Sequence, residues 1–180
     1  HEGFPNRCIA QALALLGFME SSKKGQAASL AMNAEGTWMH LLKLSLALYT
    51  AQWPLASRLL NYAPLRLMAQ HTRNASGQAA SLGEQISQAN AWILLARIST
   101  FAGVDLRRYE GAQGVSIPAQ LAEIGRTGPD TPEWQAQPEH YQCWLAAISA
   151  LLRDEAVSVI PSDVMHLMPV AWSLLSETGH

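Results

Sequence analysis

The sequence contains few charged residues and no long apolar runs, and each of these absences argues against a class of protein. Charged residues make up only 14% of the 180 residues, and the formal net charge is −2. Lysine and arginine form no cluster, so the chain lacks the electrostatic footprint of a nucleic-acid binder. No apolar run reaches the ~18 residues of a membrane-spanning helix; even residues 41–49 are broken by Lys43 and Ser45. We therefore expect no nucleic-acid and no membrane partner.

Cysteine and metal-binding patterns are equally sparse. Cys8 and Cys143, the only cysteines, lie far apart in sequence and leave two alternatives, a disulfide in an oxidising compartment or two free buried thiols. The histidines share no local metal-ligand spacing. There is also no glycine-rich phosphate loop and no nucleophile or paired-carboxylate constellation. The sequence predicts no metal site.

Hydrophobic residues, by contrast, reach 49%, and their spacing is helical almost everywhere. The clearest stripe lies in 134–153, where Tyr141, Trp144, Leu145 and Ile148 recur three, four and seven residues apart. Short connections between segments favour antiparallel neighbours. We predict one all-α domain over residues 1–180, made of antiparallel helical hairpins. The predicted helices are 7–20, 24–33, 36–51, 54–71, 84–102, 117–125, 134–153 and 162–176.

Local signals refine these boundaries. Pro132 after Thr131 fits the first turn of a helix, and Ser162 is a predicted N-cap. Pro64 and Pro169 interrupt helical patterns and should kink or restart those helices. Residues 156–160 are β-branched, but the run is short and more typical of a connector than of a strand.

The predicted helix at 36–51 is apolar on more than one face. Its polar stripe is narrow and includes His40 and Lys43. A helix of this kind is usually covered by neighbours on several sides. We expect it to be an inner helix.

Several short motifs follow one another along the chain. They are Gly17-Phe18-Met19-Glu20, Gly25-Gln26-Ala27, Asn33-Ala34-Glu35-Gly36-Thr37-Trp38, Arg66-Leu67-Met68-Ala69-Gln70, Gly103-Val104-Asp105-Leu106 and Pro132-Glu133-Trp134. Their order resembles the alginate lyase family, a family of helical-toroid polysaccharide lyases. The resemblance covers roughly residues 9–135 and corresponds to the later part of that domain. It implies a partial α/α toroid, completed by a second copy or another chain, or a smaller bundle.

The resemblance also implies a partner and a location. Members of the family cleave acidic polysaccharides such as alginate and other polyuronates, and need no metal or organic cofactor. It places the chain in the periplasm or among secreted proteins. The chain begins with His1 rather than Met, so we expect that it is processed, tagged or cut from a longer protein.

Polyuronate lyases break a glycosidic bond by β-elimination, which requires a group that neutralises the carboxylate, a base and an acid. In the resembled family these are Asn, His and Tyr, and the site reads Asn-Asn-His-Gly-Thr-Trp-Tyr-Asp. Here Asn33 is kept, but Ala34 replaces the neutralising Asn and Glu35 replaces the His. The stretch 77–90, where the resemblance places the catalytic Tyr, contains neither Tyr nor Arg. The elimination chemistry is therefore predicted to be lost or altered.

Two residues remain as candidate catalytic groups. Glu35 is either a substituted base or a carboxylate at a helix start, where the helix dipole favours it. A carboxylate is a weaker base than imidazole near neutral pH, and its charge would repel the uronate that must be neutralised. His40, at the position of the motif's Asp, lies one turn after Gly36 on the polar stripe.

Four residues are candidates for binding substrate: Asn33, Trp38, Lys43 and Asn90. Trp38 either stacks on a sugar ring or packs in the core. Asn90 lies among apolar residues and either lines a cleft or braces the loop at 72–83. The run 107–109, which reads Arg-Arg-Tyr, either meets an acidic glycan or belongs to a solvated loop.

The sequence predicts an alginate-lyase-like module that acts on or binds an acidic polysaccharide. A non-catalytic structural or protein-binding helical domain is the alternative of a different class. A third hypothesis is an active lyase with relocated groups, in which Glu35 or His40 serves as the base.

Overall fold

The computed structural model describes residues 3–75 and 80–153, and within these ranges every regular element is a helix. The predicted all-α class is confirmed. The α-helices are α1 (Gly3–Ser21), α2 (Lys23–Leu30), α3 (Ala34–Tyr49), α4 (Trp53–Ala75), α5 (Leu82–Phe101), α6 (Ile117–Thr127), α7 (Pro132–Ala136) and α8 (Pro138–Leu152). Three 3-10 turns join them: η1 (Leu106–Arg108), η2 (Ala112–Gly114) and η3 (Gly128–Asp130).

Most helix starts are fixed by a short polar side chain. Asn33 accepts a hydrogen bond from the backbone N–H of Gly36 at 3.0 Å, and Ser22 accepts one from Gly25 at 3.0 Å. Ser81, Ser116 and Thr131 cap α5, α6 and α7 in the same way. Each such cap contributes about 1 kcal/mol by satisfying a backbone donor that the helix leaves free. The start predicted around Thr131 is confirmed.

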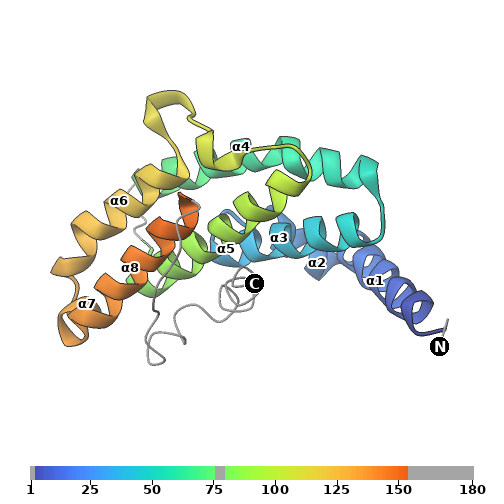
Figure 1. Ribbon diagram of the computed structural model, residues 1–180, viewed down its shortest axis with the longest axis horizontal. Coiled ribbons are helices and arrows are strands. Elements are labelled where there is room, and N and C mark those ends of the chain that lie inside the picture. The colour runs from blue at the N-terminus through green and yellow to red at the C-terminus, as the bar shows by residue number, and fades with distance from the viewer. Residues whose placement is uncertain (1–2, 76–79, 154–180) are drawn as a thin grey trace.

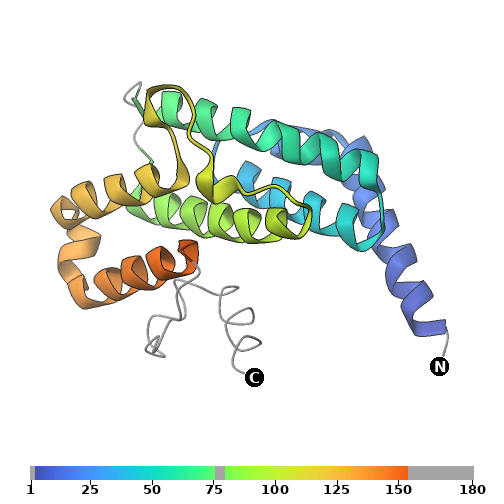
Figure 2. The ribbon, with the colours of Figure 1, turned by 45° about the horizontal axis from the view of Figure 1, so that its top comes forward.

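Helix α3 is the inner helix that the sequence predicts. It packs against α1, α2, α4 and α5, and Leu44 and Ala47 on it are fully buried. Helix α5 lies beside α3 and also packs against α6 and α8, so the core extends to these two helices (Figures 1 and 2). Helix α4 runs along one side of this pair, while α1 extends at the opposite end from α6, α7 and α8.

One predicted helix needs correction, and one of the two alternatives predicted for Pro64 is excluded. The segment 134–153 is not one helix, because the chain breaks at Gln137 between α7 and α8. Pro138 lacks an N–H and forces the residue before it out of the helical region, so a new helix starts there. Pro64, in contrast, does not restart a helix: α4 passes through it without ending. The buried residues Leu60, Ala63 and Leu67 on both sides of Pro64 hold α4 against its neighbours.

Some predictions fall outside the described residues, namely the helix at 162–176 with Ser162 and Pro169, and the run 156–160.

Cys8 and Cys143 are both free and partly exposed, so there is no bridge between them. In the part of the chain that the structure describes, no helix is long and apolar enough to cross a membrane.

Candidate functional site

The segment that carries the resemblance forms the first turns of α3. Asn33 is the N-cap and Glu35 lies exposed in the first turn. The position of Glu35 fits a carboxylate held near the positive end of the helix dipole. Gly36 is required by close packing: a Cβ there would lie 1.8 Å from the carbonyl oxygen of Ala31 and 2.6 Å from Arg66 Nη1.

The two candidate catalytic residues lie on different faces of α3. An α-helix turns about 100° per residue, so residues five apart, such as Glu35 and His40, are separated by about 140° around the axis. Glu35 and Trp38 line a groove of about 560 Å3 together with Met39, Leu41, Leu42 and Ser45. His40 lines a separate cavity. The structure does not bring Glu35 and His40 together.

Trp38 connects two inner helices. Its indole Nε1 donates to Ser87 Oγ on α5 at 2.9 Å, and its ring is partly buried against the core. The remaining ring surface contributes to the groove over α3, which is almost wholly apolar. Trp38 thus packs against the core, as one of the two alternatives predicts, and also borders a groove, while its stacking on a sugar ring stays a prediction.

Asn90 belongs to the interior. It is buried, and its Oδ1 accepts a hydrogen bond from Trp144 Nε1 at 3.1 Å. This bond joins α5 to α8 and satisfies a polar group that would be costly to bury alone. Asn33, Trp38, Lys43 and Asn90 therefore do not converge on one cleft, and their role in binding a substrate stays a prediction.

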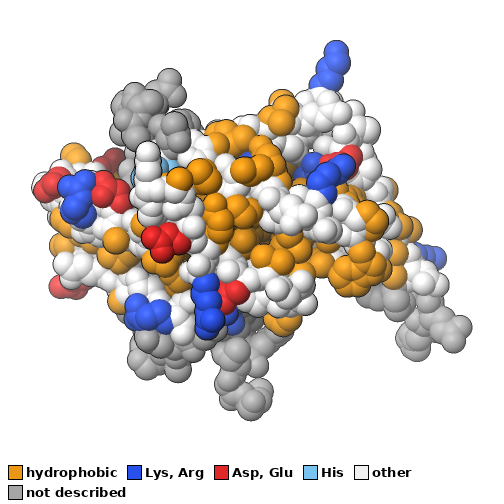
Figure 3. Space-filling model, turned by 90° about the horizontal axis from the view of Figure 1, so that it is seen from above, with side chains coloured by type: hydrophobic (Ala, Val, Ile, Leu, Met, Phe, Trp, Pro, Cys, Tyr) orange, Lys and Arg blue, Asp and Glu red, His pale blue; other side chains and the backbone are white. Residues whose placement is uncertain are grey.

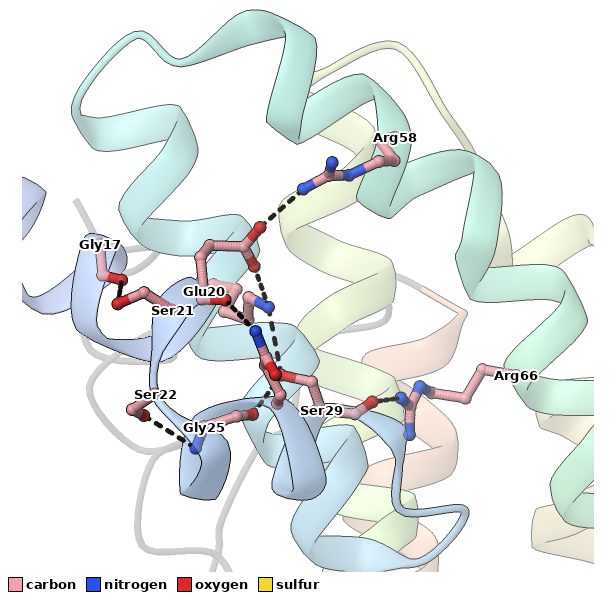
Figure 4. Close-up of polar contacts among 10 residues, drawn as sticks. Gly17, Glu20, Ser21, Ser22, Gly25, Ser29, Arg58 and Arg66 are labelled. Carbon is pink, nitrogen blue, oxygen red and sulfur yellow. Dashed lines mark hydrogen bonds and ion pairs between the residues drawn. The ribbon is translucent and has the colours of Figure 1, made fainter.

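The cavity on the other face of α3 lies between α1, α2, α3 and α4 and has a volume of about 230 Å3. Lys43 is buried in it, pairs with Glu20 of α1, and donates to Ser29 Oγ at 3.1 Å. Glu20 also accepts from Arg58 of α4 at 2.7 Å (Figure 4). Although burial raises the pKa of Glu20, these two cations lower it below its ordinary value.

His40 sits in this cavity as a neutral imidazole. Burial, the charge of Arg66 and the charge of Lys43 lower the pKa of His40 to about 4, against the opposing effect of a hydrogen bond to the backbone of Leu59. The ring is only 3% exposed and lies nearly parallel to the ring of Tyr62, with 6.2 Å between centroids. Its Nε2 has no hydrogen-bond partner.

Arg66 is a buried cation that the sequence analysis placed in a motif but not among the candidate site residues. It is 1% exposed, its two terminal nitrogens donate to the carbonyl oxygens of Ala31 and Ser29, and its guanidinium carbon lies 5.6 Å from the centre of the Tyr62 ring. Burial lowers its pKa. A signal was present: polar residues recur every fourth position along α4, which places them on one face. They are Arg58, Tyr62, Arg66 and Gln70.

A larger cleft, of about 660 Å3, lies between η1, α6 and α8. Arg107, Arg108 and Arg153 contribute guanidinium groups to it, and Leu121 and Leu145 are among its apolar lining residues. Asp105 pairs with Arg107 at 2.8 Å and with Arg108 at 3.3 Å. A hydrogen bond from Arg107 lowers the pKa of Asp105, so this carboxylate stays charged. Two of the three guanidinium groups that line the cleft thus pair with the carboxylate of Asp105.

Acidic, cysteine and histidine side chains do not gather into a metal site. Within residues 3–75 and 80–153, no three of them lie close enough to hold a metal ion.

Comparisons with known proteins give a likeness of fold. No family model and no curated protein matches the sequence. A crystal structure of an alginate lyase from Bacteroides ovatus superposes with a TM-score of 0.71 over 94% of this chain, at 19% sequence identity. The chain shares the fold of that lyase. It spans 47% of the length of the lyase chain, so the shared part is about half of the larger helical protein.

Proposed function

We propose that this chain is an alginate-lyase-like helical module that binds an acidic polysaccharide and has lost the elimination chemistry. The observation that carries the proposal is the cleft of about 660 Å3, which Arg107, Arg108 and Arg153 line together with apolar residues. Clefts of this size hold small ligands and short oligomers. The shared fold with an alginate lyase supports a sugar polymer as the ligand, and we propose a periplasmic or secreted location on the same basis.

The charge of the cleft matters because the chain as a whole offers no attraction for a polyanion, with a formal net charge of −2. A polyuronate would therefore have to be held by local cations. Arg108 is suited to this role, since its side chain is 89% exposed while it remains paired with Asp105. Guanidinium groups bind carboxylates with two parallel hydrogen bonds. The leucines that line the cleft, such as Leu121 and Leu145, fit the apolar faces of sugar rings.

The proposed loss of elimination chemistry rests on the positions of Glu35 and His40. His40 is buried and uncharged at neutral pH, in a cavity apart from the groove beside Glu35. Glu35 is exposed, but no cation among the residues lining its groove would neutralise the carboxylate of a uronate. A base without a neutralising partner gives little acceleration, because the C5 proton stays weakly acidic.

Two measurements test this function. A gel that contains alginate should retard the protein relative to a gel without it, and Arg108→Ala should weaken the binding about five-fold, because an exposed ionic contact contributes up to about 1 kcal/mol. Arg126→Ala removes another exposed charge, 70% exposed against 89% for Arg108, at a residue that does not line the cleft, and should bind like the parent protein. Absorbance at the band of unsaturated uronates should not rise when the protein is incubated with alginate. Equal retardation of the parent and R108A, or a rise in absorbance, would contradict the proposal.

A second candidate, a structural or protein-binding helical domain, is favoured by the exposed apolar surface. Leu13, Leu15 and Phe18 on α1 and Leu42 on α3 are exposed, and the groove over α3 is almost wholly apolar. Figure 3 shows hydrophobic side chains gathered over the middle of the face seen from above, with charged groups around them. Sedimentation velocity decides between the two candidates. Self-association that Leu42→Asp abolishes, together with no retardation by alginate, would favour the second.

A further inference from the structure

The cavity between α1, α2, α3 and α4 combines buried positive charge with polar atoms that have no partner. Its volume of about 230 Å3 is several times the roughly 30 Å3 that one water molecule occupies in the liquid. Leu30 and Arg58 are among its lining residues and are exposed, so the cavity borders the solvent there. Glu20, Arg58, Ser29 and Arg66 lie around this region in Figure 4.

Arg66 supplies a donor that lacks an acceptor. Its two terminal nitrogens are occupied by backbone carbonyls, but its Nε is buried without a hydrogen-bond partner. Among the described residues no carboxylate pairs with Arg66, because Glu20 is engaged by Lys43 and Arg58. A buried guanidinium without a counter-ion is costly, and an anion beside it would lower that cost.

His40 supplies the complementary group, an acceptor that lacks a donor. A hydrogen bond between the ring and the backbone of Leu59 raises the pKa of His40. The ring is therefore the donor of this bond, and the carbonyl oxygen of Leu59 is the acceptor. Because Nε2 has no partner, that bond must use Nδ1, and the neutral ring carries its proton there. The lone pair of Nε2 is therefore buried and unused.

We infer that this cavity binds a small hydroxy-carboxylate, whose carboxylate accepts from Arg66 and whose hydroxyl donates to Nε2 of His40. The charges facing the cavity favour an anion, because the three cations Lys43, Arg58 and Arg66 outnumber the one carboxylate, Glu20. Tyr62 and Ser29 are uncharged lining residues. This is a second site, separate from the arginine-lined cleft, and it does not depend on the proposed polysaccharide function.

Ligand-observed NMR at pH 7 and constant ionic strength provides the test, with sodium acetate, glycolate and chloride as probes. Acetate and glycolate differ by one hydroxyl. Glycolate should bind about three to ten times more tightly than acetate, which corresponds to one hydrogen bond. Chloride should not compete with glycolate at equal concentration. No saturation transfer to either carboxylate, or equal affinities for acetate and glycolate, would overturn the inference.

Two variants at one position assign the site. His40→Leu removes the acceptor, so acetate should still bind while the preference for glycolate disappears. His40→Asp places a carboxylate beside Arg66, so both ligands should lose binding more than ten-fold. Arg126→Ala is the control for a lost surface charge and should bind both ligands normally. If H40L retains the preference, or if H40D binds glycolate like the parent protein, the ligands bind elsewhere and the inference fails.

Discussion

Gln70 and Arg66 lie one turn apart on the same face of α4, yet their surroundings differ. The Gln70 amide is fully used: Nε2 donates to Thr37 Oγ1 at 2.7 Å and to the carbonyl of Asn33 at 3.2 Å. Its Oε1 accepts from Gln88 at 2.7 Å and from Trp92 at 2.8 Å. Arg66 keeps an unpartnered Nε and an unneutralised charge.

The difference separates a structural joint from a binding site. A buried polar network in which every member is satisfied fixes the packing of its helices and leaves nothing for a ligand to bind. Gln70 thus holds α3, α4 and α5 together at the turn that carries the resemblance to the lyases. A group left unsatisfied at equal depth has a reason other than stability, and an external ligand is such a reason.

The largest expected effect is that of breaking the satisfied network. Gln70→Leu keeps the volume but removes the acceptor of Trp92 Nε1 and of Gln88 Nε2, and the donor to Thr37 Oγ1, which still donates to the carbonyl of Asn33. Each orphaned buried group costs about 1–3 kcal/mol, so we expect a loss of about 4 kcal/mol in the free energy of unfolding, measured with urea. Gln26→Leu, at an exposed residue, should change it by less than about 0.5 kcal/mol. A loss below about 1 kcal/mol in Q70L would contradict the assignment of Gln70 as a joint.

The next effect concerns pH and comes from His40. Its folded pKa of about 4 lies below the ordinary 6.5, so between these pH values the unfolded chain takes up a proton that the folded chain does not. The stabilisation from the neutral ring is complete above pH 6.5 and is lost as the pH falls toward 4. The loss amounts to about 3 kcal/mol, since each unit of pKa corresponds to about 1.4 kcal/mol.

His40→Leu isolates this contribution. The variant keeps Lys43, Arg58, Arg66, Tyr62 and Glu20 around the cavity, so effects of those groups remain in both proteins. The free energy of unfolding, measured with urea at pH 7, 5.5 and 4.5, should fall less steeply in H40L than in the parent protein. Parallel pH profiles for the two proteins would show that His40 is not buried as an uncharged ring.

Much of the fold can be predicted from local patterns in the sequence. The apolar stripe of α3, with its narrow polar strip, identifies an inner helix, and Asn33 and Thr131 mark helix starts through their capping chemistry. The break at Gln137 was also within reach, since Pro138 restricts the residue before it. The passage of α4 through Pro64 was not, because it depends on packing against helices distant in sequence.

The site was harder to predict because its atoms come from four helices. Helical spacing alone separates Glu35 from His40, so their placement in different cavities follows from the sequence. That Arg66 meets Ala31 and Ser29 instead of a carboxylate depends on how α2 packs against α4. The spacing of residues along the chain does not show that a buried arginine will lack a carboxylate partner. The pairing of Arg107 and Arg108 with Asp105, by contrast, is local, so the run 105–108 could have indicated it, but the sequence analysis did not predict it.

The smallest expected effect comes from giving Arg66 a side-chain partner, as Gln70 already has. His40→Asp places a carboxylate where the charge of Arg66 already acts on the native ring. A charge-assisted hydrogen bond contributes about 1.5–3 kcal/mol, but burying the carboxylate offsets part of it, so we expect H40D to exceed H40L in stability by about 1 kcal/mol. Urea midpoints at pH 7 with unchanged slopes would measure the difference. If H40D is the less stable of the two, the Ala31 and Ser29 carbonyls and the Tyr62 ring already compensate the charge of Arg66, and the cavity needs no anion.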